Sequence, residues 1–190
     1  MKKSYIIVAI VLIIAGWFIV TYNSLVKKDE QVKNEWNEVQ NAYQRRMDLV
    51  PSLVSIVKGA ANYEQTTLVE VTEARSKAAS VDVTTISADA YNQQAAAQDA
   101  LAASSNRLLV SVEKYPELKG TDAFKGLQVQ LEGTERRIKF ARKDFNTAIA
   151  DYTSSVRSFP TSIVAHITGF QPKDGFQADA GTDKSVEIKF

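Results

Sequence analysis

The run Phe124–Phe159, FKGLQVQLEGTERRIKFARKDFNTAIADYTSSVRSF, has the clearest periodicity in the chain. Its large apolar side chains recur in steps of three and four residues, or sums of these steps, at Phe124, Leu127, Leu131, Ile138, Phe145, Tyr152 and Phe159. A stripe with this spacing keeps one face of a helix apolar. We therefore expect a long helix over about 123–159, ended by Pro160, whose apolar face other helices must cover.

Glycine and proline, which most often interrupt helices, are absent from residues 23–50 and 60–115. We expect three further helices, over about 23–48, 49–79 and 88–115, with a loop at 80–87 and a turn at 116–122. A short amphipathic turn over 161–168 should follow Pro160. Four helices of this length predict an all-α fold, an antiparallel long-helix bundle.

The junction between the first two of these helices allows two arrangements. Asp48 offers a helix N-cap, and Pro51 would then occupy the first turn, where a missing N–H costs nothing. The chain would turn back here and give a bundle of four helices. Alternatively it kinks at Asp48–Pro51, and three bundle members result because the first two helices are one.

An uncharged apolar segment, YIIVAIVLIIAGWFIV at 5–20, precedes the helices and extends to Tyr22. Its length suits a transmembrane helix, with Trp17 and Tyr22 near one interface. A cleaved signal peptide is disfavoured because the segment lacks a small-x-small cleavage site, and a buried core helix because it is not amphipathic. We expect a flank at 1–4, a membrane helix at 5–22, a bundle at 23–170 and a tail at 171–190.

Lysines next to the apolar segment bear on its orientation. Lys2 and Lys3 directly precede it, whereas the lysines on its other side lie farther away and are partly offset by acidic residues. The positive-inside rule then predicts a single-pass protein of the cell membrane, with a cytoplasmic N-terminus and an exported bundle.

Composition argues against several classes of function. The 190 residues carry 23 Lys+Arg against 22 Asp+Glu, so no basic surface for nucleic acid is expected. The chain has no cysteine and one histidine, His166, and it lacks Glu-x-x-His pairs, a G-x-S-x-G motif and a phosphate-binding glycine loop. We expect neither an enzyme nor a bound cofactor or metal.

Charged residues on or beside the apolar stripes are candidate site residues. We interpret them as an arginine–carboxylate network that fixes helix register, in preference to a polar binding site inside the bundle. The candidates are Arg46, Asp48, Glu64, Glu132, Glu135 and Arg142. A basic run on the last long helix is interpreted as a solvated face rather than a lipid-binding one, because Ile138 and Phe145 divide it.

The last residues, VEIKF, alternate apolar and polar side chains. Val186, Ile188 and Phe190 could add a strand to a PDZ-like sheet edge or to a neighbouring copy. The alternative is a frayed tail or one that docks on its own bundle.

Two blocks of the chain resemble the LemA family. The first carries the signature Arg-Arg-x-Asp-Leu-Val-Pro-x-Leu-Val followed by Val-Lys-Gly, at Arg45, Arg46, Asp48, Leu49, Val50, Pro51, Leu53, Val54, Val57, Lys58 and Gly59. The second carries Leu131, Glu132, Glu135, Arg137, Ile138, Ala141, Arg142, Phe145, Asn146, Phe159, Pro160, Gly169 and Phe170. The resemblance implies a membrane-anchored long-helix bundle without an established enzymatic activity, in a family of which some members shape magnetosome membranes.

The function expected from these features is that of a non-enzymatic membrane scaffold that self-associates or binds another envelope protein through its C-terminus. The alternative is a lipid-binding protein that remodels membranes through its basic run and the segment 161–170.

Overall fold

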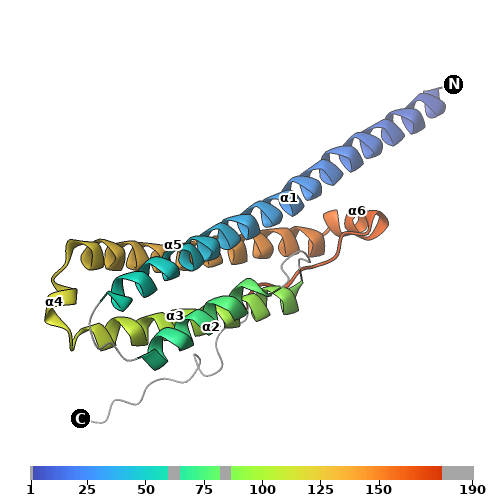
Figure 1. The fold of residues 1–190 in the computed structure, drawn as a ribbon. Helices are drawn as coiled ribbons and strands as arrows, with labels where there is room; N and C mark the ends of the chain where they lie inside the picture. The colour runs from blue at the N-terminus through green and yellow to red at the C-terminus, as the bar shows by residue number, and fades with distance from the viewer. Residues whose placement is uncertain (1, 60–64, 82–86, 177–190) are drawn as a thin grey trace, which may run out of the picture.

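A computed structural model describes residues 2–59, 65–81 and 87–176. These residues form helices α1 (Lys2–Lys58), α2 (Gln65–Ala79), α3 (Ala88–Val112), α4 (Pro116–Lys119), α5 (Asp122–Arg157) and α6 (Thr161–Thr168), and no strand. α1 and α5 lie antiparallel in one layer, and α2 and α3 lie antiparallel in a second layer beneath them (Figure 1). The predicted all-α antiparallel bundle is confirmed.

The periodic run that predicts the last long helix forms α5. Thr121 caps its N-terminus, accepting a hydrogen bond at 3.3 Å from the backbone N–H of Phe124. Six of the seven predicted stripe residues are buried, from Phe124 to Tyr152. The seventh, Phe159, is 82% exposed, because the helix ends at Arg157 and leaves this residue in the turn before α6. The prediction was wrong at that position.

Of the two arrangements predicted for Asp48–Pro51, the turn is wrong, because α1 continues through Pro51 as one helix to Lys58. Proline has no N–H to donate to the carbonyl of Met47, four residues earlier. Arg75 of α2 supplies a donor instead, with its Nε 2.9 Å from the Met47 oxygen. The single helix predicted over 49–79 is therefore wrong: these residues contribute the end of α1 and then α2. The backbone leaves the first helix at Gly59.

The buried apolar side chains form two clusters along the bundle. The first joins α1 residues from Leu25 to Tyr43 with the second half of α5 and with α6. The second joins the end of α1 with α2, α3 and the first half of α5. The two clusters adjoin on α1 between Tyr43 and Met47, and Arg46 lies at that boundary.

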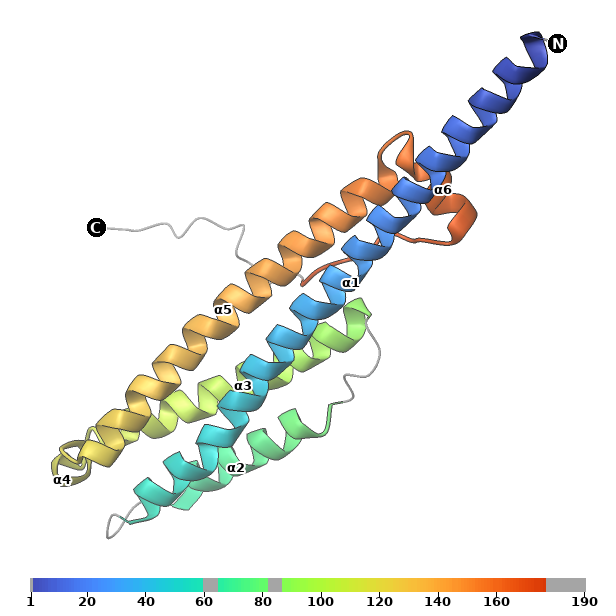
Figure 2. The ribbon, with the colours of Figure 1, turned by 90° about the horizontal axis from the view of Figure 1, so that it is seen from above.

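The N-terminal part of α1 projects beyond the bundle (Figure 2). Residues 5–20 are exposed except for Phe18, which is half-buried. By length and composition this is the one helix, among the described residues, that could cross a membrane, and its apolar window is 0% buried. The exposure excludes a core helix, because a core helix would have its apolar side chains covered by the rest of the protein.

Candidate functional site

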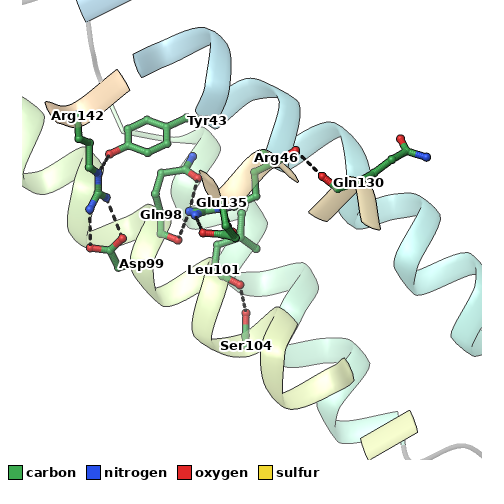
Figure 3. Close-up of polar contacts among 10 residues, drawn as sticks. Tyr43, Arg46, Gln98, Asp99, Leu101, Ser104, Gln130, Glu135 and Arg142 are labelled. Carbon is green, nitrogen blue, oxygen red and sulfur yellow. Dashed lines mark hydrogen bonds and ion pairs between the residues drawn. The ribbon is translucent and has the colours of Figure 1, made fainter. Parts of the chain in front are cut away.

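Arg46 is the centre of a polar layer between the two apolar clusters. Its side chain is 2% exposed. Its Nε donates to Glu135 Oε1 at 2.8 Å, its Nη2 pairs with the second oxygen of the same carboxylate, and its Nη1 donates to the backbone oxygen of Gln98 at 2.8 Å (Figure 3). A two-pronged contact of this kind fixes both distance and angle between its partners. The layer thereby joins α1, α3 and α5.

Arg142 of α5 makes a second contact across the same three helices. Its Nε donates to the hydroxyl of Tyr43 at 2.7 Å, and its Nη2 lies 2.8 Å from Asp99 Oδ1 (Figure 3). Burial raises the pKa of Tyr43, although the positive charge of Arg142 opposes this change. The phenol therefore stays protonated at neutral pH and acts as an acceptor for Arg142.

The structure brings together some of the residues predicted for the network and separates others. Arg46 and Glu135 form one contact, and Arg142 forms the neighbouring one. Asp48 lies within α1, not at a helix start, and accepts from Gln44 at 2.8 Å. Glu132 is exposed and accepts from Gln128, one turn away on α5. Glu64 lies outside the described residues.

Three members of the polar layer were missed from the sequence: Tyr43, Gln98 and Asp99. Tyr43 is buried among the apolar side chains of α1, so nothing in its place in the sequence marked its hydroxyl as a polar contact. Gln98 carried a usable signal, because the stripe of α3 continues backward from Leu101 in three- and four-residue steps. Buried side chains follow that stripe at Tyr91, Gln94, Gln98, Leu101, Ser105, Leu108 and Val112. Asp99 carried none, since it stands on the partly exposed side of the helix.

Residues 170–176, here called the strap, cross back over the bundle after α6. The ring of Phe176 lies 5.3 to 6.0 Å from those of Phe145, Tyr91 and Trp36, measured between centroids. Gly169 makes the reversal possible, because its φ of 81° lies in the left-handed region that side chains disfavour. The strap thus adds an aromatic side chain to the core between α1, α3 and α5.

Polar contacts hold the strap at several points. Thr153 Oγ1 donates to the oxygen of Lys173 at 2.9 Å and accepts from its N–H at 3.1 Å. Asn146 Oδ1 accepts from the N–H of Phe176 at 2.9 Å. A Cβ at Gly175 would stand 2.5 Å from that same Asn146 oxygen, so a larger residue there would force the Asn146 side chain to move and disturb its bond to Phe176.

Lys173 also forms an ion pair with Asp29 of α1, which pairs in turn with Lys33 at 3.1 Å. Partial burial opposes ionisation of Asp29, but the contacts to Lys173 and Lys33 outweigh it and hold the pKa of Asp29 below its ordinary value of 3.8. The described tail residues therefore dock on their own bundle. The predicted strand residues Val186, Ile188 and Phe190 lie outside the described residues.

The chemistry available in these contacts is that of positioning. Within residues 2–59, 65–81 and 87–176, no group of three His, Asp or Glu side chains could hold a metal ion. The arginines of the polar layer are occupied by carboxylate, carbonyl and phenol oxygens of neighbouring helices. His166 is exposed on α6, away from the layer. The arrangement can fix helix register and hold the strap.

A candidate membrane span that continues without a break into a four-helix bundle, crossed by arginine–carboxylate contacts, defines a membrane-associated helical-bundle protein. The model of the LemA family matches residues 35–190, and the chain belongs to that family.

Curated relatives agree with this assignment. Protein LemA of Metamycoplasma hominis is 24% identical over 167 residues, which cover 86% of this chain and 74% of that protein. Two proteins of Paramagnetospirillum magneticum, Magnetosome protein MamQ 1 and MamQ 2, are each 32% identical over 80 residues, or 42% of this chain. The chain spans only 29% of the length of either MamQ protein.

Proposed function

We propose that the chain is a non-enzymatic, single-pass membrane scaffold that self-associates or binds another envelope protein. The continuity of α1 carries this proposal: one helix of 57 residues provides both the candidate span and the bundle's first core face. A bundle attached in this way keeps a defined orientation to the membrane, which a flexible linker would not give. The bundle lies on the exported side, with Lys2 and Lys3 in the cytoplasm.

The C-terminal residues are the part proposed to meet a protein partner. Val186, Ile188 and Phe190 have the alternation that strand addition requires. The strap fixes the chain to the bundle as far as Phe176, and the proposed strand residues follow it in the sequence.

Cross-linking in intact membranes tests the scaffold. We expect the full chain to give cross-linked oligomers or a cross-linked partner, and a chain truncated before Ser185 to lose the partner product. A chain that remains monomeric, with the same products before and after truncation, contradicts the proposal. Protease treatment of intact and lysed cells tests the orientation. A protease that reaches the exported side cleaves an exported bundle before lysis, whereas it cleaves a cytoplasmic bundle only after lysis.

A second candidate function is membrane remodelling by lipid binding. Its support is that two relatives are named as magnetosome proteins and that α6 leaves Ile163 and Ile167 uncovered. Reconstitution of the full chain into vesicles distinguishes the two functions. Remodelling predicts vesicles whose diameter and shape change with protein density, whereas a scaffold alone leaves them unchanged.

A further inference from the structure

α6 lies beside α1 at the end of the bundle from which the N-terminal part of α1 projects (Figure 1 and Figure 2). Two contacts set its level along α1. Phe18 packs against the cluster that contains Val164 and Ala165 of α6. The ring of Tyr22 lies 5.9 Å from that of Phe170, just after the end of α6.

The turn before α6 reaches the same level. A recess of about 350 Å³ is lined by Trp17 and Val20 of α1, by Ser158 of the α5–α6 turn and by Thr161 at the start of α6, among others. The segment from Trp17 to Tyr22 covers about 8 Å of helix. Its aromatic rings are of the kind that collects where hydrocarbon gives way to headgroups. A bilayer spanned by α1 would therefore meet the bundle at α6.

The outward side of α6 carries two large apolar side chains beside the exposed His166. Val164 and Ala165 face the bundle, while Ile163 and Ile167 are 48% and 67% exposed, and Phe159 in the preceding turn is 82% exposed. Residues 158–172 contain no Asp, Glu, Lys or Arg, which makes them the longest uncharged run outside the candidate span. Exposed Phe140 of α5, by contrast, has basic and acidic neighbours.

We propose that α6 is an interfacial membrane helix, whose side chains Ile163 and Ile167, with Phe159 of the preceding turn, enter the boundary between headgroups and acyl chains. The inference rests on the proposed membrane anchoring by α1 and adds a second contact with the same bilayer. The outward side of α6 lies at the level where the candidate span ends, and this position identifies lipid as its occupant. Two contacts at separate points fix the tilt of the bundle, which a single helix would leave free.

Depth-dependent fluorescence quenching in the full chain tests the inference, because the chain has no native cysteine. Ile163→Cys and Ile167→Cys are labelled singly with an environment-sensitive dye and reconstituted into vesicles. Three quenchers are compared: a lipid with a nitroxide near its headgroup, a lipid with a nitroxide on its acyl chain, and a water-soluble quencher. Phe140→Cys is the matched control, because Phe140 is also apolar and is 60% exposed, but lies about 25 Å from the end of α5. Ile10→Cys reports on the span.

We expect the lipid nitroxide to quench dyes at 163 and 167 several-fold more strongly than a dye at 140. The inference is overturned if the headgroup nitroxide quenches the dyes at 140, 163 and 167 equally weakly. If the acyl-chain nitroxide still quenches a dye at position 10, the membrane anchor stands. If position 10 also stays accessible to an aqueous quencher, the anchor itself fails. Dyes at 163 and 167 that neither the lipid nitroxides nor the aqueous quencher can reach would place a second copy on α6, which also overturns the inference.

Discussion

Arg46 and Glu135 form one ion pair in two environments. Arg46 is 2% exposed, whereas Glu135 is 45% exposed. Removing the arginine frees a carboxylate that water can reach, but removing the carboxylate leaves a buried charge with only the Gln98 oxygens as acceptors. The partly exposed residue is therefore the one whose charge the fold needs most.

Glu135→Ala is expected to lower the free energy of unfolding by about 2–3 kcal/mol, near the lower end for breaking a buried ion pair. The measurement is a urea titration in mild detergent, followed by far-UV circular dichroism. Glu132→Ala is the matched control, one turn earlier on α5 and bonded only to Gln128 in the described structure, and should change stability by less than about 0.5 kcal/mol. Equal effects of the two substitutions would show that Arg46 does not depend on its partner.

Asp29 makes the docking of the strap sensitive to acid. Because its pKa in the folded protein is held below 3.8, its contribution to stability is complete above that pH and is lost as the pH falls through the folded value. Protonation weakens the Lys173 contact, and Phe176 should then leave the ring of Trp36. In a Trp17→Phe background, the emission of Trp36 reports this as a red shift below about pH 4.

Asp29→Asn provides the comparison for the acid response. The variant lacks the ion pair at every pH, so its emission at neutral pH should already lie toward the red and change less on acidification. Parent and variant with the same acid profile would assign the response to other carboxylates.

Among the helices, α1 was the element that the sequence predicted least well. A proline inside a helix usually bends or ends it, and Asp48 offered a cap in the right position. In the structure the Met47 carbonyl, which Pro51 cannot bond, accepts from Arg75, 28 residues away. No local sequence pattern predicts such a contact. The apolar stripe of 124–159, by contrast, located the buried face of α5, because periodic burial is a local property.

The donor from Arg75 gives a prediction for a double-mutant cycle. Arg75→Ala leaves the Met47 carbonyl without a partner and should cost about 1–2 kcal/mol. In a Pro51→Ala background the new N–H binds that carbonyl, so the same substitution should cost about 1 kcal/mol less. Both values come from urea titrations. Arg107→Ala, which removes the exposed α2–α3 pair with Glu70, is the control and should show no coupling to Pro51. Additive effects of Arg75→Ala and Pro51→Ala would contradict the idea that the Arg75 side chain takes the place of the N–H that Pro51 lacks.

At the scale of the whole molecule, the sequence predicted the bundle and the candidate span, and at the site it identified Arg46, Glu135 and Arg142 as polar residues near the core. It could not pair them correctly. Arg46 joins Glu135 and Arg142 joins Asp99 because of how α1, α3 and α5 are aligned, and that alignment depends on packing over the full length of the bundle. The docking of Phe176 was likewise out of reach, since it depends on the reversal at Gly169.

The continuity of α1 predicts that the candidate span and the bundle move as one rigid unit, and a distance measurement tests this. Spin labels at Ile10→Cys and Asn37→Cys are both on exposed positions, twenty-seven residues apart. At a rise of about 1.5 Å per residue, an unbroken helix holds their backbones about 40 Å apart. Pulsed dipolar spectroscopy in nanodiscs should give one narrow distribution near that value. Insertion of Gly-Gly-Ser-Gly after Asn23 should broaden it, because glycine permits many backbone conformations. A shorter or equally broad distribution in the parent chain would place a hinge between membrane and bundle, and would remove the fixed orientation on which the scaffold depends.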